Sequence, residues 1–182
     1  MTDDHLVLVN GCINKNINAQ RELYERYAPK MLSVCERYMG NEDDARDAMH
    51  DGFIRLFDRI SKFEQRGSLD GWVRKLFVNT CLEKLRKLKK NPFQNFDEDN
   101  EDMQISNNSI PDAETQIEAK ELLNCVKNLP ASLRSIFNLH AIEGYSHEEI
   151  AELLEITSST SRGGYFKARA MLKEKIKLIY EI

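Results

Sequence analysis

Two stretches of the chain interleave cationic side chains with aromatic, amide and hydroxyl groups. Residues 59 to 90 hold ten Lys or Arg against three acidic residues, a local charge of +7, and residues 157 to 177 hold six against one, a local charge of +5. Cations bind phosphates, whereas aromatic and amide groups contact bases, so this combination is typical of a nucleic-acid surface. A solvated helix face carries similar charges, and charge alone leaves the two interpretations equal.

An acidic segment separates the two basic ones. Residues 97 to 121 hold nine acidic residues against Lys120, a local charge of −8, which hides the basic segments within a net charge of −4. A polyanion is repelled by such a segment and attracted by its neighbours. The charge pattern therefore predicts two separate polyanion-binding surfaces joined by an acidic connector.

The remaining residues that could do chemistry are scattered. The sequence has no Gly-rich phosphate loop, no paired His and Cys ligands and no favourable Ser/His/Asp arrangement. Its cysteines never form a C-x-x-C pair and each falls in a helical pattern, which favours buried small hydrophobes over a metal or redox site. We therefore expect no catalytic residue, no metal and no cofactor. The cysteines are Cys12, Cys35, Cys81 and Cys125, and the histidines are His5, His50, His140 and His147.

Length and hydropathy place the chain among folded proteins. Its 182 residues, of which 41% are hydrophobic, suffice for one domain or two small ones. The N-terminus reads Met1-Thr2-Asp3-Asp4 instead of the basic stretch that opens a secretory signal, and no apolar run approaches the roughly 18 residues that span a bilayer. We expect a cytoplasmic protein.

A change of composition divides the chain into modules. The segment from Asn91 to Asp112 has two prolines, many Asn and Asp residues and no sustained apolar period. This composition predicts a flexible linker. We therefore expect an N-terminal module at residues 1–90, the linker at 91–112 and a C-terminal module at 113–182.

Apolar residues at helical spacing predict three helices in the N-terminal module. The first carries one apolar stripe and ends near Gly40. The second opens on the acids at 42–44, which favour a helix N-terminus, and its apolar surface is wider than one core stripe requires. The third starts near Ser68 as N-cap and runs through Leu88. No segment with a period of two competes, so the predicted fold class is all-α.

The C-terminal module repeats the pattern in shorter helices. Pro130 ends one helix and Gly144 closes the next. Ser146 and Glu149 fit a capping box at the start of a short helix, and Thr157 can cap another helix a few residues later. Helix, short turn and helix form the helix-turn-helix signature, and a basic second helix suits insertion into a major groove.

Three blocks of the sequence, taken together, carry a family resemblance. They are ERYAPKMLSVCERYMGNEDDARDAMHDGFIRLF, then GSLDGWVRKLFVNTCLEKLRK, then LPASLRSIFNLHAIEGYSHEEIAELLEITSSTSRGGYFKARAML. A lone helix-turn-helix occurs in many repressors, whereas three blocks in this order, separated by an acidic linker, are specific. The chain resembles the extracytoplasmic-function (ECF) branch of the sigma-70 family of RNA polymerase sigma factors.

The resemblance implies two small helical modules joined by a flexible acidic linker, the second a helix-turn-helix domain of winged-helix-like type without a wing. Residues 1–90 would bind the polymerase clamp and the promoter minus-ten element. Residues 113–182 would bind the polymerase flap and the minus-thirty-five element.

The same resemblance implies roles for individual residues. The polymerase-binding residues, on the second helix, are Asp47, His50, Asp51, Ile54 and Arg55. The minus-ten residues are Arg66, Gly67, Ser68, Trp72, Arg74, Lys75, Asn79, Lys84, Arg86 and Lys87, with the loop at 64–68 accepting a base flipped out of the duplex. The minus-thirty-five residues are Ser158, Ser159, Thr160, Ser161, Arg162, Phe166, Lys167 and Arg169.

Several of these assignments have a structural alternative. The charges of the second helix could be only solvated, and the loop at 64–68 could be an ordinary turn with Ser68 as N-cap. Trp72 could belong to the core, as a single Trp at helical spacing often does. Tyr165, at a position where the family usually carries Leu, is assigned to the core.

Other residues also depart from the family pattern, among them His50, where Gln is frequent. Glu155 occupies the turn where Gly is usual, so a left-handed backbone there is either strained by about 1 kcal/mol or avoided by another turn. Gly163 and Gly164 stand inside the last helix and cost roughly 1 kcal/mol each relative to Ala. Base-reading side chains often occupy those positions, so we predict that promoter choice leans on Arg162, Lys167 and DNA shape.

The resemblance also implies the partners. These are core RNA polymerase, promoter DNA and an anti-sigma factor, with no small-molecule substrate, and the free chain is expected to be monomeric. The alternative is a free-standing regulator that uses only its helix-turn-helix and dimerises to read two half-sites. An enzyme acting on nucleic acid is disfavoured, because the sequence offers no catalytic motif.

Overall fold

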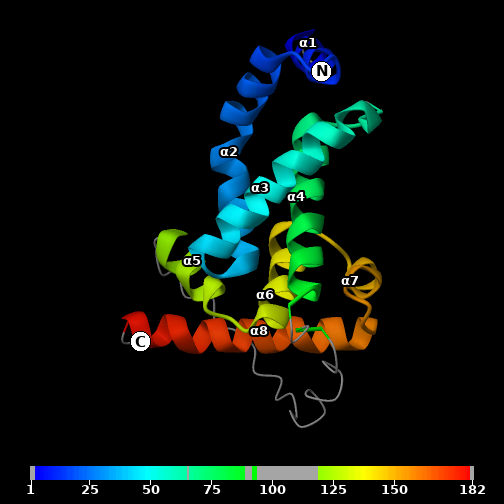
Figure 1. The fold of residues 1–182 in the computed structure, drawn as a ribbon. Helices are drawn as coiled ribbons and strands as arrows, with labels where there is room; N and C mark the ends of the chain where they lie inside the picture. Colours follow the sequence, from blue (N-terminus) through cyan, green and yellow to red (C-terminus); the bar gives the residue numbers. More distant parts are fainter. Residues whose placement is uncertain (1–2, 65, 89–91, 94–118, 181–182) are drawn as a thin grey trace. The chain divides into compact units, whose positions relative to one another are not determined.

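The computed structural model describes residues 3–64, 66–88, 92–93 and 119–180, and these residues fold mainly as helices (Figure 1). The all-α prediction is thereby confirmed. Contacts divide the chain into two compact units, Met1–Leu85 and Arg86–Ile182, and each is described by itself. Apart from Pro92 and Phe93, the predicted linker at 91–112 lies outside the described residues.

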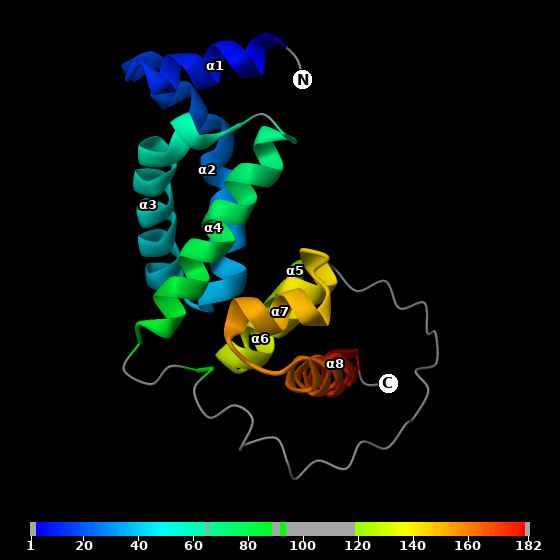
Figure 2. The ribbon, with the colours of Figure 1, turned by 90° about the vertical axis from the view of Figure 1, so that its right-hand side faces the viewer.

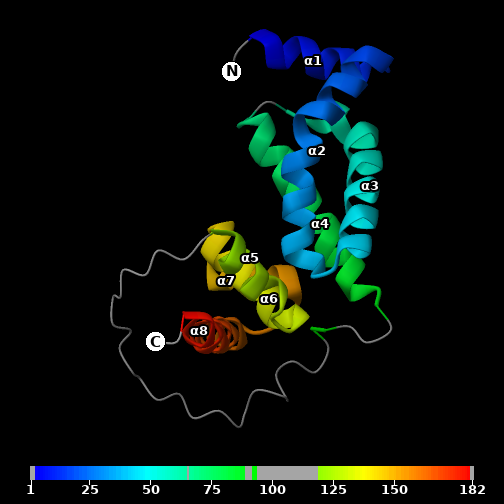
Figure 3. The ribbon, with the colours of Figure 1, turned by 90° about the vertical axis from the view of Figure 1, so that its left-hand side faces the viewer.

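Three long helices of the first unit run alongside one another, and the shorter α1 lies across their end (Figures 2 and 3). The elements are α1 (Asp3–Ile13), α2 (Ile17–Met39), α3 (Glu42–Arg59), the 3-10 turn η1 (Ile60–Lys62) and α4 (Leu69–Arg86). Their fully buried side chains include Leu23, Tyr27 and Tyr38 of α2, Ala48 and Leu56 of α3, and Val73 and Phe77 of α4. The apolar stripes predicted for the three long helices thus form one core.

Capping residues set where these helices begin and end. The side-chain oxygen of Asn41 accepts a hydrogen bond from the backbone N of Asp44 at 2.9 Å, and an acidic first turn of α3 follows. Ser68 Oγ accepts from the backbone N of Gly71 at 3.0 Å, which confirms Ser68 as the N-cap of α4. Gly40, with a φ of 81°, ends α2 in the left-handed conformation that favours glycine.

Helices α3 and α4 approach each other closely at one point. The Phe77 ring meets the Phe53 ring edge to face, with centroids 5.0 Å apart. A Cβ atom on Gly52 would lie 2.4 Å from Phe77 Cε1, so this approach requires glycine. Helix α4 then ends at Arg86, although the apolar pattern predicts helix through Leu88. Leu88 is exposed, so no buried contact of that side chain favours another turn.

The second unit packs three short helices against one long helix, α8 (Figure 1). The elements are α5 (Ala119–Lys127), α6 (Ala131–Phe137), the π-helical turn η3 (Asn138–Ile142) that continues α6, α7 (His147–Leu154) and α8 (Ser158–Tyr180). Buried side chains of its core include Leu133, Ile136, Leu139, Ile150, Leu154, Ala168 and Leu172. The breaks predicted at Pro130 and Gly144 both occur, since α5 ends at Lys127 and η3 at Ile142. Gly144 takes the left-handed conformation, with a φ of 78°.

A buried arginine fastens the end of α5 to α6. Arg134 Nη1 donates to the carbonyl oxygens of Lys127 and Leu129 at 2.7 and 3.0 Å. Carbonyls at a helix C-terminus have no partner within the helix, and Arg134 supplies one. Burial lowers the pKa of this guanidinium, which nevertheless remains charged at neutral pH.

The cysteines, the arrangement of possible metal ligands and the apolar character of the helices indicate whether other kinds of site are present. All four cysteines are buried and free, as predicted, and burial raises the pKa of the Cys12 thiol. Within the part of the chain that the structure describes, no three His, Cys, Asp or Glu side chains gather as metal ligands would. None of the described helices is long and apolar enough to cross a membrane.

Candidate nucleic-acid and protein interfaces

One face of α3 carries the residues predicted to bind a protein partner. We call Asp47, His50, Asp51, Ile54 and Arg55 the α3 face. Their spacings of three and four place them on one side of the helix. Ile54 is 50% exposed, and the other members are exposed apart from the half-buried Arg55. An exposed apolar side chain ringed by charges is suited to contact with another protein.

Ion pairs join this face to α4. Arg55 Nη1 lies 2.6 Å from Glu83 Oε2, and Lys84 Nζ lies 3.4 Å from Asp51 Oδ2 and 3.7 Å from Asp47 Oδ2. The Lys84 side chain is only 25% exposed. Lys84, predicted as a minus-ten residue, is therefore engaged by two carboxylates of the α3 face, and the structure groups it with that face instead of with the exposed cations of α4.

The loop ahead of α4 is exposed. Arg66, Gly67 and Ser68 are all solvent-accessible, and Arg66 Nε lies 3.2 Å from Glu64 Oε2. A Cβ on Gly67 would meet nothing within 4 Å, so packing inside the protein does not require glycine there. Ser68 Oγ uses its lone pair as the N-cap, while its hydroxyl proton is left to donate elsewhere. The turn and a binding role are thus compatible.

Trp72 has features of both interpretations that the sequence left open, a core residue and a DNA-binding residue. Its ring is half-buried and contacts the buried Phe63, with centroids 5.6 Å apart. Lys75 and Asn79 follow at spacings of three and four, so the three side chains share one face of α4. Lys75 is exposed and Asn79 half-buried. The remaining predicted minus-ten residues on this segment are the half-buried Arg74 and Arg86 and the exposed Lys87.

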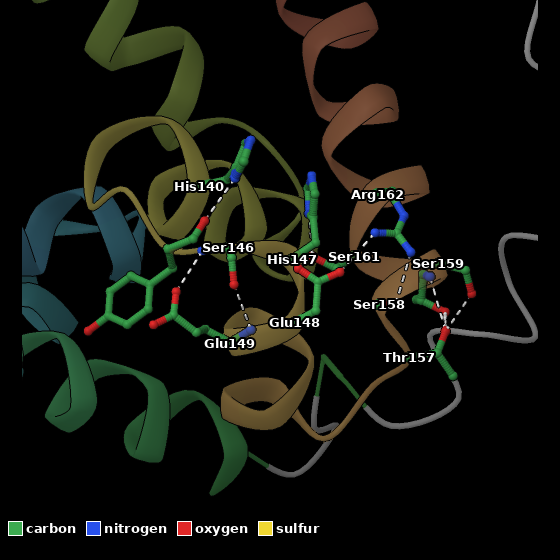
Figure 4. A network of polar contacts seen from close by, with 12 residues as sticks. His140, Ser146, His147, Glu148, Glu149, Thr157, Ser158, Ser159, Ser161 and Arg162 are labelled. Carbon is green, nitrogen blue, oxygen red and sulfur yellow. Dashed lines mark hydrogen bonds and ion pairs between the residues drawn. The ribbon is translucent and has the colours of Figure 1, made fainter.

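In the second unit, hydrogen bonds fix the helix-turn-helix (Figure 4). Ser146 Oγ accepts from the backbone N of Glu149 at 3.1 Å, and Glu149 Oε2 accepts from the backbone N of Ser146 at 2.8 Å, which confirms the capping box. Thr157 Oγ1 accepts from the backbone N of Thr160 at 3.1 Å at the start of α8. Glu155 adopts the left-handed conformation, with φ 59° and ψ 43°, so the turn is kept without glycine at a cost of about 1 kcal/mol.

Four predicted minus-thirty-five residues form an exposed stripe along α8. Their spacings of three and four place them on one side of the helix. The α8 stripe consists of Ser159, Arg162, Phe166 and Arg169. Phe166 is 40% exposed and adds an aromatic ring to this side of the helix. Ser158, Thr160 and Lys167 are half-buried. The stripe presents hydroxyl, cationic and aromatic groups together, as contact with bases and phosphates requires.

Ser161 departs from the prediction. Its side chain is fully buried, and its Oγ lies 2.9 Å from His147 Nδ1 of α7. The residue is on the inward side of α8, where it joins the two helices of the motif. Ser161 is therefore not part of the exposed surface of α8, and its direct contact with DNA stays a prediction that this buried position does not favour.

Glu148 is a functional candidate that the sequence did not reveal. Its Oε1 accepts from Arg162 Nη1 at 3.0 Å, while Arg162 Nη2 donates to Ser158 Oγ at 3.0 Å. A hydrogen bond with its own backbone N–H, followed by the Arg162 contact, lowers the pKa of the Glu148 carboxyl. Fourteen residues separate the pair. No local pattern indicates such a contact, and only the geometry of the motif brings it about.

Two histidines stack beside the same turn. The rings of His140 and His147 lie 4.2 Å apart at 22°, and Tyr165 meets His140 edge to face at 4.5 Å. His140 Nδ1 is 2.9 Å from the carbonyl oxygen of Tyr145, and because a carbonyl only accepts, Nδ1 carries the proton. Burial, then His140 and then Arg162 lower the pKa of His147. Tyr165, predicted for the core, is half-buried in this cluster.

Comparison with known proteins gives two matches to family models. Sigma-70 region 2 matches residues 23–91, and Sigma-70, region 4 matches residues 119–172. The first covers most of α2 and all of α3 and α4, with the α3 face and the exposed Lys75. The second spans the helix-turn-helix and the α8 stripe.

Curated relatives and solved structures agree with these matches. The ECF RNA polymerase sigma-E factor of Haemophilus influenzae is 27% identical over 163 residues, 85% of this chain and 86% of that protein. The ECF RNA polymerase sigma factor SigW of Bacillus subtilis is 23% identical, over 88% and 90%. CnrH, solved with the cytosolic domain of CnrY, has a TM-score of 0.50 at 17% identity, covering 94% of this chain and 96% of that one. The sigma factor RpoE of Bartonella quintana, solved with the anti-sigma factor NepR, has a TM-score of 0.52 at 20% identity, over 86% and 96%.

Proposed function

Since the chain belongs to the ECF group of the sigma-70 family and directs RNA polymerase to promoters, we propose that its two units divide the recognition of the promoter between them. The first unit binds the minus-ten element and assists strand opening. The second unit binds the minus-thirty-five element. The observation that carries this division is the place of the exposed cations. Lys75 on α4 and Lys87 just after it lie within the region 2 match, and Arg162 and Arg169 of the α8 stripe lie within the region 4 match.

Strand opening is proposed for the exposed side of α4 and the loop before it. Extruding a base costs a few kcal/mol, which stacking and hydrogen bonds must recover. Trp72, half-buried on Phe63, offers a supported aromatic ring, and Lys75 offers an exposed cation on the same face. The Ser68 hydroxyl, which can donate while it accepts from Gly71, and the open space at Gly67 suit close approach of a nucleotide.

Polymerase binding is proposed for the α3 face. The ion pairs from α4 hold its carboxylates and Arg55 in place, and Ile54 supplies exposed apolar surface. Ordered charges around an apolar centre lose less side-chain entropy on binding than free ones. A preformed surface of this kind suits a stable subunit contact.

We further propose an anti-sigma factor as regulatory partner, a cytoplasmic location and a monomeric free chain. The support is family membership, together with the two similar structures, each of which holds its factor with a second protein. A free-standing regulator would instead dimerise and bind DNA without polymerase.

The test measures both contacts in one experiment. Purified chain is mixed with core RNA polymerase and a duplex carrying the promoter of its own operon, and the complex is footprinted. We expect protection at both promoter elements only when chain and polymerase are both present. Protection by the chain alone as a dimer, or failure of the chain to associate with polymerase, contradicts the proposal. The variant Ile54→Asp, on the α3 face, should fail to bind polymerase and should therefore show no protection at either promoter element.

A further inference from the structure

Arg162 of the α8 stripe is held by oxygens from two helices before any DNA is present (Figure 4). One branch of its guanidinium meets Glu148 of α7, and the other meets Ser158 one turn earlier on α8, each at 3.0 Å. Both members of the ion pair are open to solvent, with 55% of the Arg162 side chain and 68% of the Glu148 side chain exposed. The guanidinium therefore has a preferred orientation on an accessible surface.

A carboxylate at this place calls for a reason other than stability. An exposed ion pair adds little to the stability of a fold, because water and salt screen it. Next to a duplex, an ionised glutamate is repelled by phosphates, so it lowers affinity for DNA of any sequence. The hydrogen bonds to Glu148 lower its pKa and keep it charged at neutral pH. A carboxylate beside Arg162, the first cation of the α8 stripe, therefore lowers the affinity of the stripe for DNA.

The neighbouring residues leave base reading on this turn to Arg162. Gly163 and Gly164 follow it and carry no side chain, and a Cβ on Gly163 would meet nothing within 4 Å. An arginine reads guanine when its guanidinium faces O6 and N7, yet it binds the nearest phosphate with no sequence preference. A carboxylate fixed to one branch opposes the phosphate-bound orientation. The same carboxylate can accept a hydrogen bond from the amino group of cytosine.

We propose that Glu148 is a specificity-determining residue, which holds Arg162 for base reading and repels phosphate, so that affinity is lowered and discrimination raised. The inference rests on the proposed function, in which the α8 stripe faces the minus-thirty-five element. Glu148 acts on promoter choice by positioning Arg162. Removal of the Glu148 carboxylate should therefore change which base pairs are preferred, and not only the affinity for DNA.

The test uses the full chain assembled with core RNA polymerase. The probes are the promoter of its own operon, single-base-pair variants across its minus-thirty-five element, and a shuffled duplex of the same length. Dissociation constants are measured at one salt concentration for the unchanged chain, Glu148→Gln, Arg162→Ala and the double variant. Glu152→Gln, an exposed glutamate on the same helix, is the matched control for loss of one negative charge.

Three results are expected together. Arg162→Ala identifies the base pair that it reads, by a loss of preference of about five- to hundredfold there. Glu148→Gln binds the shuffled duplex about two- to fivefold more tightly, the size of one exposed charge, and loses part of the preference at that same base pair. In the Arg162→Ala background, Glu148→Gln leaves base preference unchanged. Glu152→Gln leaves preference unchanged in the intact chain.

Other results overturn the inference in distinguishable ways. If Arg162→Ala changes preference and Glu148→Gln does not, the role of Glu148 is wrong while the proposed function stands. If Glu148→Gln weakens all duplexes equally, with helix content and polymerase affinity intact, Glu148 is only structural. If Arg162→Ala leaves binding of every duplex unchanged, the α8 stripe does not face DNA, and the proposed function fails with the inference.

Discussion

At the scale of single residues, neighbours in the sequence can take opposite roles. Ser159 is exposed on the α8 stripe, whereas Ser161, two residues later, is buried against His147. Both serines read alike in the sequence, because a small polar side chain fits either side of a helix near its N-terminus. Only the direction in which α7 crosses α8 decides between them. Contacts such as that of Glu148 with Arg162 depend on the same direction, and sequence reasoning could not supply it.

The stacked histidines give the second unit a dependence on pH. The lowered pKa of His147 means that the unfolded chain, with a pKa near 6.5, binds a proton more readily than the folded chain. The unit therefore loses stability as pH falls below about 6.5. The charged or titratable groups that shift the pKa of His147 are the ring of His140, the cation of Arg162 and the carboxylate of Glu148. Only the carboxylate favours protonation.

Hydrogen exchange of the α7 amides at pH 7.5 and 5.5 measures this effect. We expect faster exchange at the lower pH after correction for intrinsic rates, and a smaller change in His147→Gln. The exposed His50→Gln, in the other unit, serves as control and should follow the unchanged chain. Equal pH sensitivity of His147→Gln and the unchanged chain would contradict the account.

Two glycines should respond in opposite directions to the same substitution. Gly52→Ala places a Cβ 2.4 Å from Phe77 Cε1, and we expect a loss of about 1–3 kcal/mol in the free energy of unfolding. Gly163→Ala places a Cβ in open space within α8, and we expect a gain of up to about 1 kcal/mol. Chemical denaturation of the full chain, followed by circular dichroism, measures both. A stable Gly52→Ala variant would show that α3 and α4 pack less closely than described.

At the scale of elements, the sequence predicted what local chemistry decides. The Ser and Thr caps, the capping box and the glycine at the end of α2 mark helix boundaries by themselves. The π-helical turn at Asn138–Ile142 carries no such mark. It contains the buried Asn138 and Leu139, so its geometry follows from packing within the unit. The early end of α4 also depends on tertiary contacts, because the exposed Leu88 side chain would gain no buried contact from another helical turn.

The pairing of α3 with α4 predicts separate effects for two lysines on α4. Lys84 is bound to Asp47 and Asp51, so Lys84→Ala should weaken binding to core polymerase by about two- to fivefold and leave strand opening by the assembled complex unchanged. The exposed Lys75→Ala should reduce strand opening and leave polymerase affinity unchanged. Polymerase affinity is measured by fluorescence titration, and opening by permanganate reactivity of unpaired thymines. If Lys84→Ala reduced strand opening and left polymerase affinity unchanged, Lys84 would belong with the DNA-binding residues, as the sequence predicted.

At the scale of the whole molecule, charge segregation is the feature that composition alone conceals. A net charge of −4 divides into basic segments on each side of an acidic one. Contacts divide the chain at Leu85, a few residues ahead of the boundary that composition predicts at residue 90. Each unit thus carries its own surplus of cations on a helix. Which base pairs those helices read depends on side-chain orientation, which charge counting does not provide.

The same charge pattern predicts how binding depends on salt. We expect Lys167 to contact a phosphate, so Lys167→Ala should lower promoter affinity to a similar extent across promoter variants, and the slope of log affinity against log salt should decrease by about 1. Lys177→Ala, at the far end of α8, should leave the slope unchanged. An effect of Lys167→Ala confined to one base position would instead indicate direct base reading.

The central claim is that this chain gives core RNA polymerase the ability to start at a specific promoter. Run-off transcription with purified core polymerase and the promoter of the protein's own operon tests it most directly. We expect a discrete transcript only when the chain is added, and its loss both in Ile54→Asp and in a variant that combines Arg162→Ala with Lys167→Ala. A transcript of equal yield without the chain, or none with it, would contradict the claim.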